Sequence, residues 1–324
     1  MVFIIIVFSV FDGIHGVQWL GKKGQDVFLK PFYKMTYSSS PNESKPAPSL
    51  ALQANATLPA PASTLERDFI YVKGGSFQMG GAWGDSHGVE KQPLYEERVG
   101  NYYLGKKEVT VGQFRRFVED RSYRTDAEEH DGCLTYDGMK WDKDRDANWK
   151  NPGFSQTDDH PVVCVSWNDA QAFAKWKSRQ DNFVYRLPTG AEWEYAARSG
   201  GKAYQYAWGN GAPSGNIADE SLKRKYPKVD KIWNGYDDGE VFTAPVGRYA
   251  ANELGIFDMT GNVWEWCADS FRPRNNPHNK YQYRVLRGGG WPSTPAQLQT
   301  TFQGYERQIA SYNHIGFRLA IWSR

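Results

Sequence analysis

The stretch Asn252–Glu265, which reads NELGIFDMTGNVWE, decides how the rest of the chain is interpreted. Asp258 and Glu265 can offer side-chain oxygens to a cation, and the carbonyls of Gly261 and Val263 can join them if the backbone folds back, which glycine permits. Carboxylate and carbonyl oxygens gathered in this way are the ligands that Ca²⁺ prefers. The alternative is a tight turn with ordinary solvated acids, and the spacing of the two acids alone favours that turn. The other motifs of the chain are needed to choose between a calcium site and a tight turn.

The composition limits the possible classes of function. The chain has 324 residues and a net charge of +2, with acidic and basic residues interspersed, which gives no electrostatic basis for binding nucleic acid. Thirteen Trp and 32 Gly, with a mean hydropathy of −0.68, predict a loop-rich domain held by aromatic packing rather than a bundle of long helices. The three cysteines form no C-x-x-C motif, so the usual signature of a zinc site is missing.

Two segments precede the expected folded domain. Residues 1–16 contain the apolar run VFIIIVFSV, which is too short to span a bilayer and resembles the hydrophobic region of a secretory signal without its basic flank. A buried strand or a wrongly assigned start codon is the alternative. Residues 17–66 include a stretch rich in Ser, Pro, Ala and Asn without periodicity, which predicts a low-complexity linker. If the first segment is a signal, the protein is secreted or periplasmic.

The folded domain is expected over residues 67–324. Short strands are predicted at residues 69–72 and 102–104, and the pair Gly74 and Gly75 predicts a hairpin turn after the first of them. Helices are predicted where a capping residue is followed three positions later by a side chain that can bond back to it. The pairs that fit this pattern are Thr110 with Gln113, Ser166 with Asp169, and Thr189 with Glu192.

Seven motifs in the domain carry a family resemblance. They are GGSFQMG (74–80), EVT (108–110), HPVVCVSWNDA (160–170), RLPTGAEWEYAAR (186–198), the opening stretch (252–265), RVLRGGGW (284–291) and IGFR (315–318). In sequence and in order they resemble the formylglycine-generating enzyme family, also called sulfatase-modifying factors. The resemblance runs from about Phe69 to the C-terminus, and it is specific for the family without being specific for one activity.

The resemblance implies both a fold and metal sites. The implied fold is α+β and C-type-lectin-like, with few short helices and strands and much irregular structure. The resemblance also implies two structural calcium sites. The first would use Asn216, the carbonyl of Ile217, Asp238 and a carbonyl near Glu240. The second would use Asp258, Gly261, Val263 and Glu265, the set proposed above from the residues themselves.

This sequence differs from the family at the catalytic cysteines. Members that make formylglycine carry two cysteines just after the Arg-Gly-Gly-x-aromatic motif, and two thiolates there bind Cu(I), which prefers sulfur. The corresponding positions here are Ser293 and Leu298, and no Cys lies between Trp291 and Arg324. The six His are dispersed along the chain, whereas non-haem iron requires two His and a carboxylate. We therefore expect calcium but no copper or iron, and we assign no catalytic residue.

The segment 291–314 is expected to form a ligand surface. It reads WPSTPAQLQTTFQGYERQIASYNH and mixes aromatic anchors with small polar groups, a composition that suits adaptable recognition. In the variable proteins of diversity-generating retroelements, which resemble this family, the same segment is the ligand-binding surface. The alternative is that these side chains only cover a loop. The candidate ligand-binding residues are Trp291, Ser293, Gln299, Phe302, Tyr305, Arg307, Tyr312 and His314.

Two classes of function stay open. The first is an extracytoplasmic binding or accessory protein, a monomer without a stable membrane span, whose partner is an unknown protein or small-molecule ligand. The second is an oxidoreductase of the same family with altered chemistry, acting in the maturation of a protein or a secondary metabolite. The missing cysteine pair favours the first class, whereas the enzymatic members of the family keep the second one open, because a fold does not settle a function.

The cysteines allow one disulfide at most, and we expect it between Cys133 and Cys164. The bond would close a loop of about thirty residues with little core of its own, which a cross-link would help to order. Related sequences that share the segment NPGFSQ (151–156) carry a cysteine at both places, which adds to this expectation. The alternative is three free buried thiols, which is common for Cys in apolar runs.

Overall fold

The computed structural model describes residues 63–81, 93–181, 183–272 and 282–322. The predicted signal-like segment 1–16 and most of the predicted linker lie outside the described residues. The first described element, α1 (Ser63–Asp68), begins just before the predicted start of the domain at residue 67. None of the helices in the described part of the chain is both long and apolar enough to cross a membrane.

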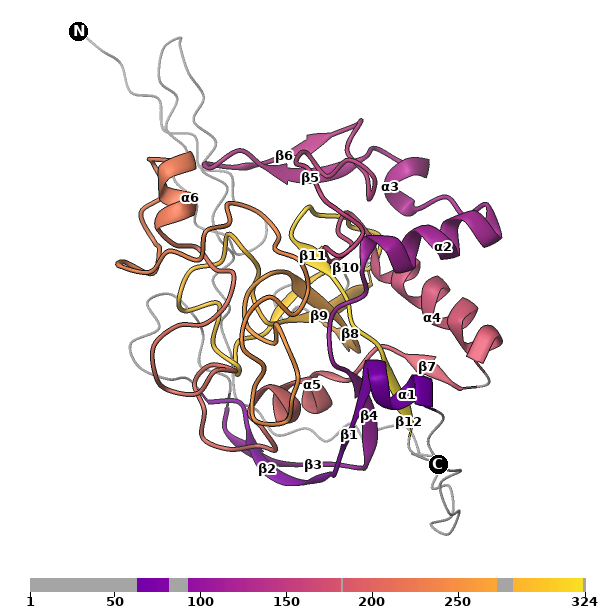
Figure 1. Cartoon of the computed structure of the whole chain (residues 1–324), viewed down its shortest axis with the longest axis vertical. Coiled ribbons are helices and arrows are strands. Elements are labelled where there is room, and N and C mark those ends of the chain that lie inside the picture. Colours follow the sequence, from indigo (N-terminus) through magenta and orange to yellow (C-terminus); the bar gives the residue numbers. More distant parts are fainter. Residues whose placement is uncertain (1–62, 82–92, 182, 273–281, 323–324) are drawn as a thin grey trace, which may run out of the picture. The chain divides into compact units, whose positions relative to one another are not determined.

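The first sheet joins the beginning of the domain to its end (Figure 1). Its strand order is β1 (Phe69–Val72), β4 (Tyr102–Gly105), β12 (Ala320–Trp322) and β7 (Tyr185–Arg186). All three neighbouring pairs are antiparallel. The two central strands each contribute a residue without exposed surface, Leu104 and Ala320. The strands predicted at 69–72 and 102–104 are therefore confirmed.

The hairpin predicted at Gly74 and Gly75 is wrong. The strand β2 (Gly75–Met79) follows β1 closely but pairs with β3 (Tyr95–Val99) in a separate two-stranded ribbon. A Cβ on Gly74 would lie 2.3 Å from the carbonyl oxygen of Val99. Glycine is required there by the close approach of two backbones and not by a reversal of the chain.

The second four-stranded sheet contains the last two residues of the stretch 252–265. Its strand order is β10 (Gly304–Arg307), β9 (Tyr283–Arg287), β8 (Trp264–Phe271) and β11 (Ile315–Gly316). The β8–β11 pair is parallel and the other two pairs are antiparallel. Glu265 lies opposite Arg287, and an irregularity follows between Trp266 and Ser270. Glu265 is therefore held by a sheet, whereas Asp258 precedes it in irregular structure.

All three predicted helix starts are confirmed. The helices are α2 (Val111–Arg121), α4 (Trp167–Asp181) and α5 (Gly190–Ala197). Thr110 and Thr189 form reciprocal capping boxes with the side chains of Gln113 and Glu192. At the start of α4, the Asp169 carboxylate accepts the Ser166 amide at 2.8 Å, and the Ser166 hydroxyl accepts the Asp169 amide at 3.1 Å. These bonds satisfy amide groups that the helix itself leaves without partners.

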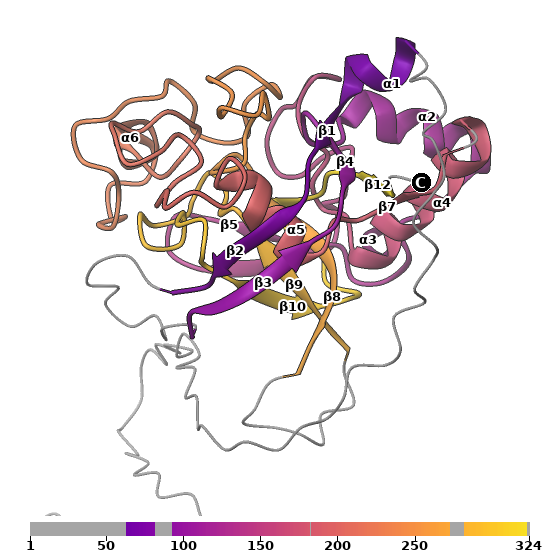
Figure 2. The same cartoon turned by 90° about the horizontal axis from the view of Figure 1, so that it is seen from below.

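Aromatic rings form the centre of the core between α2 and α4. The Phe114 ring contacts those of Phe117, Trp149, Phe173 and Phe317, with centroid distances from 5.4 to 6.5 Å. Both views place α1, α2 and α4 on one side of the domain and α6 (Glu220–Lys225), with its long irregular neighbours, on the other (Figures 1 and 2). The expected loop-rich α+β domain is confirmed.

A disulfide-braced hairpin follows the short helix α3 (Asp126–Glu129). The hairpin consists of β5 (Cys133–Tyr136) and β6 (Trp141–Asp144). The predicted bond between Cys133 and Cys164 is present. Leu134 also exchanges backbone hydrogen bonds with the C-terminal segment, from its amide to Ser311 at 2.9 Å and from the Asn313 amide to its carbonyl at 3.0 Å. The hairpin is thus tied to the predicted ligand segment at two points.

Candidate functional site

Ser293 and Leu298, the two positions that the resemblance predicts for the cysteine pair of the family, lie near each other. A Cβ on Gly289 would be 3.3 Å from the Ser293 Cβ and 2.8 Å from a methyl carbon of Leu298. Both side chains are buried. The Ser293 hydroxyl accepts the Gly290 amide at 2.9 Å, and Leu298 packs in an apolar cluster with Tyr206. At these two predicted positions the chain has a bonded hydroxyl and a hydrocarbon group, and neither is a ligand for Cu(I).

The one cysteine outside the disulfide, Cys267, does not supply a substitute thiolate. It lies in β8 and is completely buried. Burial raises the pKa of its thiol well above the ordinary value. A thiol in this environment stays protonated and inert, as structural cysteines do.

Trp291 belongs to the core and not to an open ligand surface. Its indole N–H donates to the Asn313 carbonyl at 3.3 Å, and its ring packs edge-on against Phe242 and Phe154, with centroids 5.2 and 6.0 Å away. Residues of the segment 216–242 cover this part of the chain. For this reason Trp291, Ser293 and Gln299, three of the predicted ligand-binding residues, are buried.

Of the remaining predicted ligand residues, Tyr305 and Arg307 are two apart in β10 and point to one face, whereas Glu306 between them points to the other. Tyr305 stacks on Phe271 with centroids 4.0 Å apart, and Phe302 packs on Trp264. On the other face, the Tyr312 hydroxyl donates to the Glu306 carboxylate at 3.0 Å. Arg307, next to Glu306, keeps 40% of its side chain exposed. The structure therefore splits the predicted surface in two.

The second of these faces contains His314 under the hairpin. Its ring lies against Trp141 of β6 with centroids 4.1 Å apart, and Tyr312 packs edge-on against both rings. The His314 Nδ1 atom is buried without a hydrogen-bond partner. Burial lowers the pKa of His314 to about 3, so the ring is neutral near pH 7. The sequence analysis did not identify Trp141. The only feature that could have indicated it is that it is an aromatic residue inside the loop that the disulfide closes.

The predicted first calcium set comes together. The Asp238 carboxylate accepts the amides of Ile217 at 2.9 Å and Glu240 at 2.7 Å. Asn216 is buried, and its side-chain oxygen has no hydrogen-bond partner. Asp219, which the sequence analysis missed, accepts the Asp238 amide at 2.5 Å. A buried acid bonded to Ile217, the residue after an amide oxygen without a donor, fits a hard cation.

The predicted second calcium set is divided between two environments. Both oxygens of Glu265 are used by Arg318, at 2.6 and 2.7 Å, and one of them also accepts the Trp193 indole N–H at 2.8 Å. The acid that was expected to need a cation is therefore already neutralised by Arg318. Asp258 has positive φ and accepts the Gly247 amide at 2.6 Å. Glu265 is a poor free ligand in this arrangement, whereas Asp258 retains ligand character.

Asp258 has a buried acidic neighbour that the sequence analysis did not assign. One oxygen of Glu108 accepts the Asn262 side-chain amide at 3.0 Å, and the other is buried without a partner. Burial and the charge of Asp258 raise the pKa of Glu108 well above its ordinary value. The only available signal was the position of Glu108 in the EVT motif.

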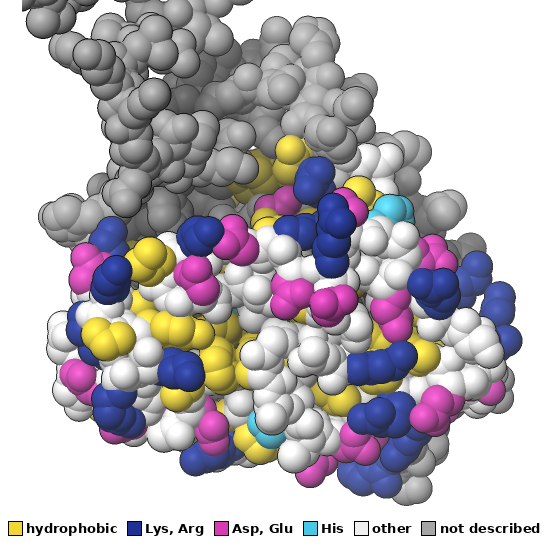
Figure 3. All heavy atoms as spheres, turned by 90° about the horizontal axis from the view of Figure 1, so that it is seen from above, with side chains coloured by type: hydrophobic (Ala, Val, Ile, Leu, Met, Phe, Trp, Pro, Cys, Tyr) yellow, Lys and Arg dark blue, Asp and Glu magenta, His cyan; other side chains and the backbone are white. Residues whose placement is uncertain are grey.

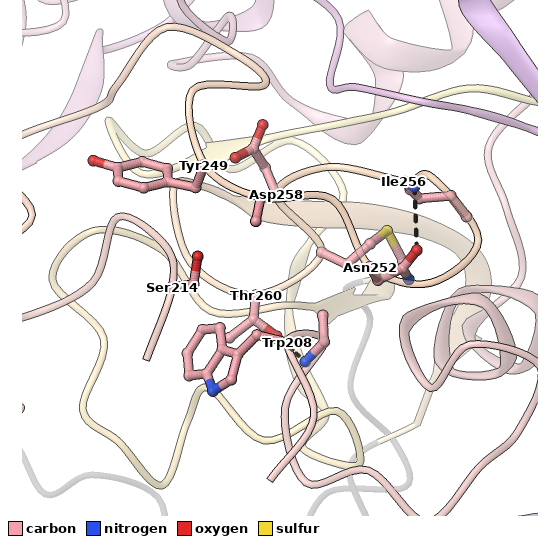
Figure 4. Close-up of a pocket in the computed structure, with 10 residues that line it drawn as sticks. Trp208, Ser214, Tyr249, Asn252, Ile256, Asp258 and Thr260 are labelled. Atoms are coloured by element: carbon pink, nitrogen blue, oxygen red, sulfur yellow. Dashed lines mark hydrogen bonds between the residues drawn. The ribbon is translucent and has the colours of Figure 1, made fainter. Parts of the chain in front are cut away.

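A small pocket adjoins the start of the second set (Figure 4). Trp208, Ser214, Tyr249 and Thr260 line it together with the backbone turn from Asn252 to Asp258. The Asp258 carboxylate points away from Trp208 and Thr260. Among the residues that the structure describes, no three His, Cys, Asp or Glu side chains are grouped to hold a metal ion. Both predicted calcium sets combine one or two carboxylates with backbone carbonyl or side-chain amide oxygens.

Known proteins share both the sequence and the fold of this domain. A formylglycine-generating enzyme from Streptomyces coelicolor is 32% identical over 310 residues, which cover 85% of this chain and 95% of that protein. The inactive C-alpha-formylglycine-generating enzyme 2 of Bos taurus is 32% identical over 282 residues, which cover 78% of this chain and 87% of that protein. The family at this level of identity therefore includes proteins named as active and as inactive.

Solved structures agree with the fold. PvdO from Pseudomonas aeruginosa superposes with a TM-score of 0.60 at 24% identity, over 78% of this chain and 93% of that one. CarF superposes with a TM-score of 0.54 at 24% identity, over 78% of this chain and 97% of that one. At this level of identity the two structures show a common fold only. The family model described as a sulfatase-modifying factor enzyme 1-like domain matches residues 55–322. The chain therefore belongs to the sulfatase-modifying factor family, whose members include the formylglycine-generating enzymes.

Proposed function

We propose that this chain is an extracytoplasmic binding or accessory protein on a formylglycine-generating-enzyme-like scaffold, without formylglycine-generating activity. The observation that carries the proposal is the pair Ser293 and Leu298. They lie near each other at the positions that the resemblance predicts for the cysteine pair, and both are buried and packed. Restoring a copper site would require two thiolates where the chain has a bonded hydroxyl and an isobutyl group.

The proposed ligand face is smaller than the whole segment 291–314. It consists of Tyr312, His314 and Trp141, with the exposed Met139 of the hairpin turn and the partly exposed Arg307 beside them. Rigid aromatic rings next to an adaptable cation suit the anchoring of a protein or small-molecule ligand. Figure 3 shows hydrophobic side chains open to solvent between charged ones on the face that carries the hairpin and α6.

The calcium proposal rests on the first set. Asn216 and Asp238 would hold the ion with side-chain oxygens, and the carbonyls of Ile217 and Glu240 would complete the set. The buried Asn216 oxygen without a donor supports this proposal. For a second ion, Asp258 would provide the charge with the carbonyls of Gly261 and Val263, because Glu265 is committed to Arg318. The ions would fix the irregular segments and would take no part in chemistry.

The proposed location outside the cytoplasm is supported by the disulfide between Cys133 and Cys164, because such bonds persist in oxidising compartments. The alternative function, an oxidoreductase of the same family, predicts a redox metal instead. Metal analysis of the purified full-length chain separates the two. Calcium without copper or iron supports the binding protein, whereas copper or iron at one ion per chain contradicts it.

A further inference from the structure

A second candidate site lies away from the proposed ligand face. A hollow of about 260 Å³ opens between α1, the connection from β4 to α2, and α4. It is slightly smaller than typical small-molecule sites, which measure about 300 to 1,000 Å³. No residue of the segment 291–314 lines it. Both the hollow and its chemistry are therefore independent of the function proposed above.

The floor of the hollow is apolar. Phe69 from β1, Val109 before α2, Phe173 from α4 and Leu319 before β12 line it. Each of these side chains is buried, with at most 7% of its surface exposed. The segment that crosses the floor has its backbone groups bonded internally, from the Val109 amide to the Phe317 carbonyl and from the Gly105 amide to Leu319. The floor therefore offers hydrocarbon surface and few free polar groups, which suits the body of an apolar ligand.

The rim of the hollow is basic. It contains four basic side chains, Arg67, Lys106, Lys107 and Lys177, against the two acidic side chains Asp68 and Glu108. Arg67 is paired with Asp68 at 3.0 Å, and Lys177 is paired with Asp181 at 2.6 Å. The four basic side chains of the lining therefore outnumber its two acidic side chains.

Lys107 is the basic group best placed to meet a ligand. It is exposed, and its ammonium group lies 5.4 Å from the centre of the Phe257 ring. Its side chain also lies across the open face of Gly247, where a Cβ would come within 2.4 Å of it. The aromatic ring and the glycine therefore hold a charged group beside the hollow, and within the described residues no carboxylate forms an ion pair with it.

We propose that this hollow binds a small organic anion with an apolar body, such as a medium-chain alkyl or aryl carboxylate. The apolar floor would take the hydrocarbon body, and the basic rim, with Lys107 foremost, would take the carboxylate. Charge complementarity is the reason for choosing an anion: an amine of the same length would fit the floor equally well but would face four basic groups at the rim, of which Arg67 and Lys177 form the ion pairs described above.

The test uses the folded full-length chain and calorimetric titration with octanoate, with octylamine as the ligand of equal length and opposite charge. We expect saturable binding of octanoate at one site and at least about ten-fold weaker binding of octylamine. Lys107→Gln should weaken octanoate roughly five-fold, the size of one partly exposed ion pair. Val246→Trp, which puts a large side chain at the half-buried edge of the hollow, should abolish binding. Lys228→Gln, an exposed lysine outside the hollow, is the matched control and should change nothing.

Three results would overturn the proposal. These are no saturable heat with octanoate, octylamine binding as tightly as octanoate, and Lys107→Gln binding octanoate like the control variant. Circular dichroism shows whether Val246→Trp is folded, and the surface variant Lys107→Gln keeps the test decisive if Val246→Trp is not. None of these outcomes depends on formylglycine chemistry or on the ligand face at His314.

Discussion

Arg318 binds Glu265 through two parallel hydrogen bonds, from Nη2 at 2.6 Å and from Nε at 2.7 Å, and neither side chain has any exposed surface. The remaining guanidinium nitrogen donates to the Gly105 carbonyl at 3.1 Å. The closing IGFR motif is thereby joined both to the opening stretch and to the central strand β4. This buried pair adds to the parallel pairing of β11 with β8, which joins the same two motifs.

Removing Arg318 should therefore be costly. Arg318→Ala leaves Glu265 buried without a counter-charge, and we expect a loss of about 3 to 5 kcal/mol in the free energy of unfolding, measured by urea titration. Arg115→Ala is the matched control, because Arg115 forms an exposed ion pair with Asp158 and should cost less than about 1 kcal/mol. Equal losses for the two variants would contradict the role assigned to the buried pair.

The disulfide should stabilise the hairpin that carries Trp141. The double variant Cys133→Ala/Cys164→Ala opens a loop with a sequence separation of 31 residues. We expect it to lose about 2 to 4 kcal/mol in the free energy of unfolding, because the unfolded chain regains freedom. Cys267→Ala, which leaves the bond intact, tests whether the loss comes from the bond. Peptide mapping without reductant that finds three alkylatable thiols would refute the bond itself.

The start of α4 should make stability depend on pH. Burial raises the pKa of Asp169 to about 6 from 3.8, although it accepts bonds from the Ser166 and Asp126 amides and the Tyr123 hydroxyl. Between pH 4 and pH 6 the unfolded state has released this proton and the folded state still holds it. Stability from this group therefore falls as pH rises through the window, by at most about 1.4 kcal/mol per pH unit.

Asp169→Asn tests this, because it removes the titrating group and keeps an acceptor oxygen. Thermal unfolding of the variant between pH 4 and pH 6 should have a flatter pH dependence than that of the parent chain. Asp181→Asn, near the other end of the same helix, should keep the slope of the parent. A parent slope that survives in Asp169→Asn would show that another group causes it.

Calcium should stabilise the domain through Asn216 and Asp238. A ligand that binds only the folded state adds about 2.7 kcal/mol at a hundred times its dissociation constant. Stripping calcium with a chelator should accordingly lower the melting temperature, and adding calcium back should restore it. Asp238→Asn should abolish most of this response, whereas Asp142→Asn, on the exposed strand β6, should retain it. An identical melting curve with and without calcium, in metal-free protein, would contradict the proposal.

Local contacts explain which parts of the fold were predictable. Thr110, Ser166 and Thr189 cap their helices through side chains three positions away, so the sequence pattern contains the whole interaction. The hairpin prediction at Gly74 is wrong because glycine is required there by the close approach of the Val99 backbone, which a local sequence pattern does not reveal. The partner of Cys133 was predictable mainly because the family resemblance supported it.

Long-range contacts explain what was missed at the candidate site. Glu265 was assigned to calcium because its partner Arg318 lies 53 residues away and a spacing argument cannot pair them. Trp291 was placed on a ligand surface, but an aromatic residue in an irregular segment has no periodicity that distinguishes burial from exposure. The segment 216–242 covers it. The sequence did not predict Trp141 as a site residue, because only the fold of the hairpin brings it to His314.

The central claim is that the side chains in place of the cysteine pair cannot support formylglycine formation. The most direct measurement is mass spectrometry of a Cys-x-Pro-x-Arg peptide after incubation with the purified chain, Cu(I) and oxygen. The Streptomyces coelicolor relative serves as the positive control. We expect the peptide to remain unmodified with the parent chain, because Ser293 and Leu298 provide no thiolate. Aldehyde formed above the uncatalysed background by the parent chain would contradict the account.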